Sequence, residues 1–167
     1  MNLKKVFEKL AANNINQAEC RYASSTSLSM EVFRGEMNNF TTHTNSVLNL
    51  DVIVDNKLIM VNTENLSKKG VDQLINSIKE TTPYVEKIGG EIFRGADKYK
   101  KYNHFNKELS LVPIEKKKQL IFDLENKLKN YDKRFSEISV SYEEASSVHE
   151  YQNTYGVKLK RKSNSYC

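Results

Sequence analysis

The sequence predicts an α+β domain in which a mixed or antiparallel sheet is flanked by about three helices. Two observations lead to this class. Segments with the apolar spacing of helices are separated by segments with the two-residue alternation of strands, and a helix–strand–strand order is loosely repeated along the 167 residues. The composition, 38% hydrophobic and 28% charged residues, fits one ordinary globular domain.

The first helix is predicted from Asn2 to Ala12. Apolar residues recur there at i, i+3, i+4 and i+7 (Leu3, Val6, Phe7, Leu10), and Asn13–Asn14 supply a stop. Extended chain then runs from Ala18 to Phe33, where apolar and polar residues alternate towards its end, and Arg34–Gly35 form the turn.

The next two strands are predicted at 47–54 and 58–63, joined by a hairpin at 55–57, with the polar residues 41–45 as a connection before them. Leu58 to Thr63 carries apolar side chains on both faces, which favours a central strand that has a helix on one face and another layer on the other. A helix follows, capped by Asn65 or Ser67 and ended by Pro83. Its apolar stripe is Val71, Leu74, Ile75 and Ile78.

Residues 84–112 show neither helical nor strand periodicity, so we expect an irregular connection that packs along the surface or contacts a partner. A helix is predicted to begin at Pro113 and to end at Tyr131. Its solvent-exposed face includes Glu125, and its apolar face consists of Leu120, Ile121, Leu124, Leu128 and Tyr131. Two strands, 137–148 and 151–167, complete the chain. These elements define one domain, 1–167, with two sub-halves at 1–83 and 113–167.

The net charge of +5 and the pI near 9.0 come from lysines scattered along the whole chain, which indicates a coding bias more than a binding patch. One run interleaves cations with rings, as single-strand nucleic-acid binders do (Lys98, Tyr99, Lys101, Tyr102). No RNP, KH or helix-turn-helix pattern surrounds it. Nucleic-acid binding is therefore an alternative function, not the leading one.

No catalytic or metal-binding motif is found. Of the three histidines (His43, His104, His149), only His149 precedes a glutamate, and no second histidine follows at zinc-ligand spacing. Gly89–Gly90 lies in no phosphate-binding pattern, and Glu143–Glu144 face opposite sides of a strand. Cys20 and Cys167 form no redox or metal pair, and Cys20 is expected in the core. The chain itself is thus predicted to hold no cofactor.

The longest apolar run is Leu58 to Val61, far below the ~20 residues that cross a bilayer, and the start of the chain lacks a signal sequence. We therefore expect a cytoplasmic protein without a membrane partner.

The order of these elements resembles the amino-terminal domain of the TldD/PmbA family, proteins once called modulators of DNA gyrase. The similar residues are 27–36 (SLSMEVFRGE), 50–57 (LDVIVDNK), 63–67 (TENLS), 90–93 (GEIF) and the Pro113 helix onwards to Ser163. These residues resemble PmbA-like members of the family more than TldD-like members. Val47–Leu48–Asn49–Leu50 replaces the family's glycine-rich strand entry, where a bulge would otherwise be expected.

The resemblance implies a non-catalytic amino-terminal domain in a bacterial metallopeptidase complex that degrades unfolded or small peptides. The HExxxH zinc motif belongs to the TldD-like subunit and lies beyond the region covered here, so zinc is expected in the partner and none of the family's metal ligands maps onto this chain. The implied partners are a TldD-like or identical subunit, a peptide, and the family's carboxy-terminal domain, which these residues do not include.

Residues 157–167 still read as a strand where the sequence stops, and such an edge usually pairs with something. Together with the two-faced strand at 58–61, this suggests a chamber wall that holds an extended peptide by strand addition, with contacts at Leu58, Met60, Val157 and Leu159. A proline at Leu159 is expected to remove a ladder hydrogen bond. The alternative is a stand-alone scaffold or ligand-binding module.

Overall fold

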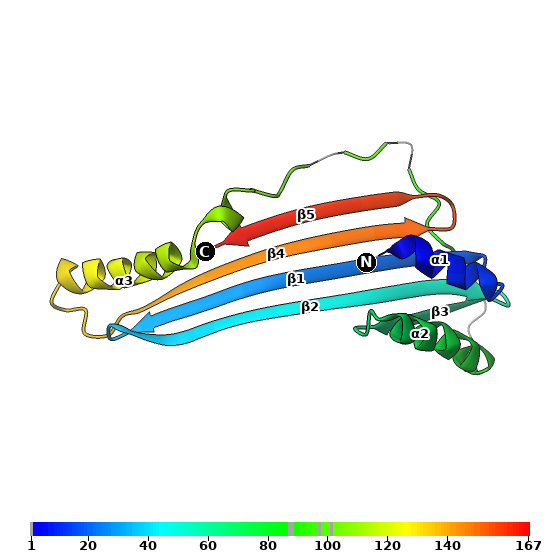
Figure 1. Cartoon of the computed structure of the whole chain (residues 1–167), viewed down its shortest axis with the longest axis horizontal. Helices are drawn as coiled ribbons and strands as arrows, with labels where there is room; N and C mark the ends of the chain where they lie inside the picture. The colour runs from blue at the N-terminus through cyan, green and yellow to red at the C-terminus, as the bar shows by residue number, and fades with distance from the viewer. Residues whose placement is uncertain (1, 87–88, 97, 101) are drawn as a thin grey trace. The chain divides into compact units, whose positions relative to one another are not determined.

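The computed structural model describes residues 2–86, 89–96, 98–100 and 102–167. The elements in chain order are α1 (Leu3–Ala12), β1 (Gln17–Phe33), β2 (Glu36–Val54), β3 (Lys57–Thr63), α2 (Lys68–Thr81), α3 (Ile114–Tyr131), β4 (Ser139–Asn153) and β5 (Lys158–Tyr166). The five strands form one sheet in the order β3-β2-β1-β4-β5, and neighbouring strands run antiparallel (Figure 1). The predicted α+β class is confirmed.

Two compact units share the strands of this sheet. One comprises residues 1–24, 45–101 and 148–161, and the other comprises 25–44, 102–147 and 162–167. Strands β1, β2, β4 and β5 each contribute one part to each unit. The units are therefore interleaved along the sequence, unlike the consecutive sub-halves 1–83 and 113–167.

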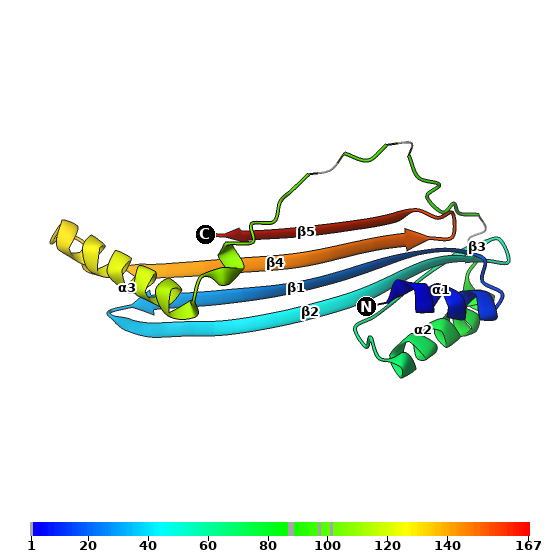
Figure 2. The ribbon, with the colours of Figure 1, turned by 45° about the horizontal axis from the view of Figure 1, so that its top comes forward.

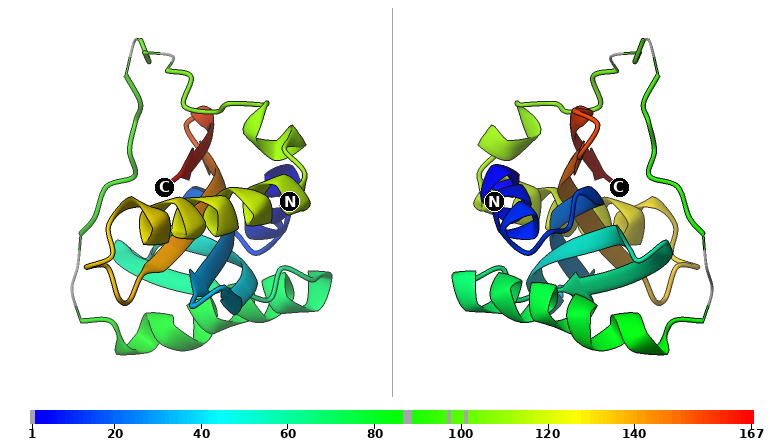
Figure 3. Two further views of the ribbon diagram at one scale, coloured as in Figure 1. Left: turned by 90° about the vertical axis from the view of Figure 1, so that its left-hand side faces the viewer. Right: turned by 90° about the vertical axis from the view of Figure 1, so that its right-hand side faces the viewer.

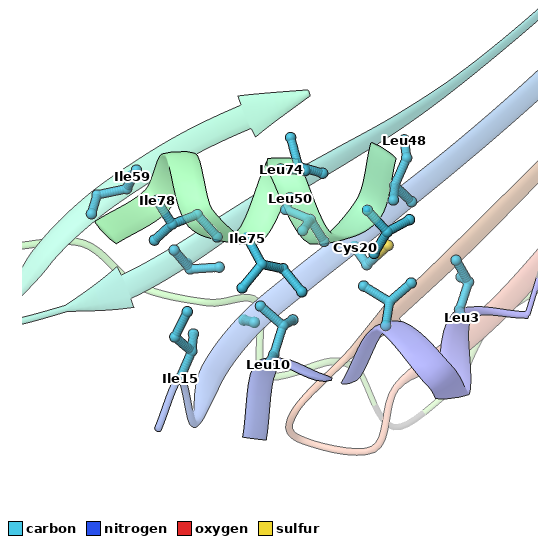
Figure 4. Packing of buried hydrophobic residues seen from close by; sticks show 14 residues of the cluster. Leu3, Leu10, Ile15, Cys20, Leu48, Leu50, Ile59, Leu74, Ile75 and Ile78 are labelled. Atoms are coloured by element: carbon cyan, nitrogen blue, oxygen red, sulfur yellow. The ribbon is translucent and has the colours of Figure 1, made fainter. Parts of the chain in front are cut away.

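In the first unit, α1 and α2 cover one face of the strands (Figures 2 and 3). The buried side chains of this core come from both helices and from β1, β2 and β3, as Figure 4 shows: Leu3, Leu10, Cys20, Leu48, Leu50, Ile59, Leu74, Ile75 and Ile78. Both helices begin as predicted, since Asn2 accepts a hydrogen bond from the Lys4 amide (3.1 Å) and Ser67 from the Gly70 amide (3.1 Å).

Two hairpins have two-residue turns. Arg34 and Gly35 take φ of 55° and 79°, and Asp55 and Asn56 take 51° and 59°, values that suit the twist of antiparallel strands. Strands β2 and β3 then pair without interruption from Val54↔Lys57 to Leu48↔Thr63. Of the residues that replace the glycine-rich entry, Leu48, Asn49 and Leu50 therefore lie in an uninterrupted ladder with β3.

The predicted polar connection at 41–45 is wrong, because β2 is continuous through it. Its side chains are exposed, so burial gives no signal there. A cross-strand hydroxyl contact joins it to β1, with Thr26 to Thr44 at 3.2 Å, and Ser46 directly after it contacts Ser24 at 2.8 Å. Threonine suits a pleated strand, and the backbone ladder holds the segment without an apolar face.

The predicted central position of the 58–63 strand is also wrong, because β3 is an edge strand. Ile59 is 2% exposed beneath α2, whereas Met60 on the opposite face is 65% exposed. Apolar residues on both faces of a strand fit a central position in the sheet. They also fit an edge strand that has one solvent-exposed face, so the sequence pattern could not distinguish the two.

The second unit has its own core, in which Ile121 of α3 packs against Met30, Val32, Val140 and Tyr142. The predicted apolar face of α3 is only partly correct. Three of its members are exposed by 44% to 83% (Leu120, Leu124, Tyr131), while Glu125, expected in water, is 2% exposed. The helix is rotated from the expected orientation because charged side chains on its buried side find partners.

The interactions that pair these buried charges involve two carboxylates, Glu125 and Glu144. Glu125 accepts hydrogen bonds from the Gly35 amide (3.0 and 3.1 Å) and pairs with Lys129 at 2.8 Å. The bond to Lys129, with a further contribution from the Gly35 amide, lowers the pKa of the Glu125 carboxyl. Glu144 pairs with the buried Lys117. Such satisfied groups can be buried without the usual penalty for an unpaired charge.

The remaining boundaries shift slightly. Strand β4 continues to Asn153, so Tyr151 belongs to β4 and not, as predicted, to the last strand. The predicted irregular connection at 84–112 is largely confirmed in its described residues: one short 3-10 turn, Thr82–Tyr84, leads into it, and another, Leu109–Leu111, lies near its end. Gly89 forms an isolated bridge with Lys57, and His104 forms one with Ser163.

Candidate functional site

Strand β5 ends the sheet, so one side of its backbone faces no further strand. Glu143 and Cys167 exchange both backbone hydrogen bonds (2.9 Å each). Because bonding alternates along an antiparallel ladder, odd-numbered residues of β5 face β4 and even-numbered residues face outward. The Asn164 amide confirms this, since it donates outward to the His104 carbonyl (3.0 Å). The outward backbone groups of Lys158 and Lys160 form no backbone hydrogen bond with another described residue.

This register changes the role of the predicted contact residues. Leu159 is half-buried and its backbone faces Tyr151, so a proline there would break the β4–β5 ladder, not an edge contact. Val157 accepts a hydrogen bond from the Asn153 amide at 3.1 Å. The residue whose N–H reports on edge pairing is Lys160. A cavity of about 400 Å³ lies beside it, lined by Glu150, Gln152 and Lys158 among others.

Strand β3 forms the other edge. The two-residue turn makes Val54 and Lys57 a hydrogen-bonded pair, so alternation turns the backbone groups of Leu58, Met60 and Asn62 outward. The Gly89 amide occupies the beginning of this edge by donating to the Asn56 carbonyl (2.6 Å). Leu58 is half-buried, and Met60 is exposed next to the open part of the edge.

A polar network lies on β1 and β2 of the first unit, and the sequence reasoning missed it. Arg21 donates to both carboxylate oxygens of Asp51 (2.8 and 2.7 Å) and to Glu19 (2.8 Å). The Glu19 and Asp51 side chains are 12% and 10% exposed. Two carboxylates around one guanidinium leave no unpaired positive charge for an anionic ligand. A charged residue at every second position of a strand, Glu19 and Arg21, was the available signal.

The same network anchors residues of the 89–96 segment. Glu19 accepts hydrogen bonds from the Tyr151 hydroxyl (2.9 Å) and the Phe93 amide (3.3 Å), and Asn153 donates to the Phe93 carbonyl (2.5 Å). Burial, together with the bond to Glu19, raises the pKa of Tyr151 to about 12. A phenol that stays protonated and donates in this way positions a loop. It is not poised for acid–base chemistry.

The predicted basic-aromatic surface divides between the two compact units. Lys98 and Tyr99 belong to the first unit, Tyr102 to the second, and Lys101 lies outside the described residues. The Tyr99 hydroxyl accepts a hydrogen bond from the Ala96 amide (2.8 Å), and the Tyr102 ring lies 6.0 Å from His104. Both rings are exposed. Nucleic-acid binding by these residues stays a prediction.

The described residues contain no group of three or more His, Cys, Asp or Glu side chains arranged to hold a metal ion. His43, His104 and His149 are each exposed. Cys20 is buried in the first core, as predicted, and burial raises the pKa of its thiol to about 12. The donor set needed for zinc is therefore not assembled by the described part of this chain.

No helix among the described residues is long and apolar enough to cross a membrane.

These features define an α+β domain whose sheet has β3 and β5 as its edge strands. Residues 18–81 match the family model for PmbA/TldA metallopeptidase domain 1. Together with the fold, this match confirms the predicted resemblance to the amino-terminal domain of the TldD/PmbA family. The sequence finds no match among curated proteins.

Solved structures share the fold over nearly the whole chain. A modulator of DNA gyrase from Thermotoga maritima has 13% identity and a TM-score of 0.81, and one from Bacteroides thetaiotaomicron has 18% and 0.82. TldE from Thermococcus kodakarensis has 12% and 0.71. The matches cover 98%, 98% and 99% of this chain but only 37%, 39% and 38% of those chains, respectively. The chain thus spans less than half the length of these structures.

Proposed function

We propose that this chain acts as a non-catalytic domain of a PmbA/TldD-like subunit in a bacterial proteolytic complex that degrades unfolded or small peptides. The match of residues 18–81 to the first domain of a metallopeptidase family carries this proposal. The domain contributes to assembly of the complex and forms part of the wall of its substrate chamber. Zinc and the hydrolytic groups belong to a TldD-like partner subunit, and the complex acts in the cytoplasm.

The free strand edges support a more specific role. An extended peptide that adds a strand to β5 or β3 gains main-chain hydrogen bonds whatever its sequence, which suits a protein that handles unfolded chains. At β5 the outward groups of Lys158 and Lys160 are available, and at β3 those of Met60 and Asn62. This binding requires no catalytic residue in the domain.

A proline substitution at an outward position tests edge binding at β5. Lys160→Pro removes the outward N–H and leaves the inward ladder to β4 in place, whereas Lys160→Ala keeps the N–H and removes only the side chain that pairs with Glu150. We expect Lys160→Pro to weaken binding of an unfolded, carboxymethylated polypeptide, about 5-fold or more for one lost hydrogen bond. Lys160→Ala should bind like the wild type. Equal binding by all three proteins would contradict pairing at β5.

A hydrolysis assay tests the non-catalytic role. The purified chain, incubated with the same polypeptide with and without added zinc, should yield no cleavage products by mass spectrometry. Zinc-dependent cleavage that persists through repeated purification would overturn the assignment of catalysis to a partner.

A further inference from the structure

A second binding feature lies in the first unit, in a groove between α1 and the beginning of α2. Its volume is about 540 Å³, within the range of small-ligand sites. Val6, Tyr22 and Val71 form an apolar floor, and Lys5, Lys9 and Lys68 form a basic rim. The floor residues belong to the core or pack against it, whereas the lysines of the rim reach solvent.

The rim carries more positive charge than its neighbours neutralise. Lys9 pairs with Asp72 and its amine lies 3.5 Å from the Lys68 carbonyl. Lys5 and Lys68 make no ion pair within the described residues. Neither α1 nor α2 has an acidic residue in its first turn, and α2 begins at Lys68, so its positive dipole end adds to the rim. The groove therefore presents two available ammonium groups above an apolar surface.

That combination selects a ligand with one anionic group and an apolar body. A polyphosphate would place its charge well but leave the floor of Val6, Tyr22 and Val71 uncovered. A carboxylate attached to an aliphatic side chain matches both parts, since lysine ammonium groups act as point charges for such an anion and the floor buries the side chain.

We infer that this groove binds the carboxy-terminal end of a peptide whose last side chain is apolar, with Lys5 and Lys68 contacting the terminal carboxylate. The inference rests on the proposed function for the choice of a peptide as the carboxylate source. The groove is separate from the strand edges: its lining residues come from α1, α2 and β1, whereas edge pairing uses β3 or β5. The domain would then hold a peptide end as well as a peptide strand.

The test is a titration of the isotope-labelled chain, followed by NMR, with three probes: acetyl-Gly-Gly-Leu as the free acid, the same peptide as its amide, and octanoate. We expect the free acid to shift the methyl signals of Val6, Leu66 and Val71, which line the groove. The amide should bind about 2- to 25-fold more weakly, because it loses two exposed ion pairs that each contribute about 1.4- to 5-fold. Octanoate carries the same carboxylate and an apolar body without peptide groups, so its affinity distinguishes a peptide from a fatty acid as the occupant.

Matched variants separate the groove from general charge. Lys5→Gln/Lys68→Gln should weaken binding of the free acid about 2- to 25-fold. Lys69→Gln/Lys79→Gln removes two charges from exposed positions outside the groove and should leave affinity unchanged. Equal affinity for acid and amide, equal loss in both double variants, or octanoate binding as tightly as the peptide would overturn the assignment.

The result remains distinct from the test of edge pairing, which uses a polypeptide and the Lys160 variants. If edge pairing is observed and the free acid fails, only the groove assignment is overturned. If the free acid binds and edge pairing fails, the proposed strand addition is overturned instead.

Discussion

The observed orientation of α3 predicts very different losses of stability for two neighbouring alanine substitutions, whereas sequence periodicity places both residues on the buried face. Ile121 is 2% exposed in the second core, whereas its neighbour Leu120 is 57% exposed. Replacing Ile121 by alanine deletes about three methylene-sized groups at about 0.8 kcal/mol each, and the remaining cavity brings the expected loss of stability to about 2–5 kcal/mol. Leu120→Ala makes a similar change on the same helix, but in water, and should cost within about 0.5 kcal/mol.

Urea unfolding followed by circular dichroism measures the difference. With a slope of about 2 kcal/mol per molar urea, Ile121→Ala should lower the midpoint by about 1–2.5 M and Leu120→Ala by less than about 0.3 M. If the Leu120 variant loses as much as the Ile121 variant, α3 packs through the face that its sequence pattern suggested, and the buried positions of Lys117 and Glu125 are incorrect.

Two further predictions concern titratable groups. Iodoacetamide at pH 8 should label Cys167, which is exposed, and spare Cys20, whose thiol pKa is about 12, so mass spectrometry should find one adduct on the native chain and two in denaturant; rapid native labelling of Cys20 would contradict its burial. The lowered pKa of Glu125 means that its ionised form stabilises the fold above the unfolded pKa of about 4.3, and that this contribution is lost as pH falls through the folded value. The urea midpoint of Glu125→Gln should therefore fall less between pH 6 and pH 3 than that of the wild type, and identical pH profiles would exclude this role.

Periodicity predicted the elements whose buried residues come from one helical stripe or one strand face. Helix α2 is the clearest case, because Val71, Leu74, Ile75 and Ile78 all lie in the core as expected. The turn at Arg34–Gly35 was equally predictable, since Gly35 readily takes the positive φ that a two-residue hairpin requires.

The errors arose where partners distant in sequence decide the structure. Glu125 is buried because the amide of Gly35, ninety positions earlier, donates to it. The position of β3 at the edge follows from the strand order of the whole sheet. The groove between α1 and α2 likewise combines lysines from two helices that the sequence separates, so no local motif marks it.

The most direct test of peptide binding is hydrogen exchange of individual backbone amides, followed by NMR, with and without a short acetylated and amidated peptide of alternating valine and threonine. Strand addition predicts slower exchange for outward amides at one edge, Lys158 and Lys160 of β5 or Met60 and Asn62 of β3. The Leu159 amide, which already faces β4, should not change. Unchanged exchange at both edges in the presence of saturating peptide would contradict the account of this domain as a wall that holds extended chains.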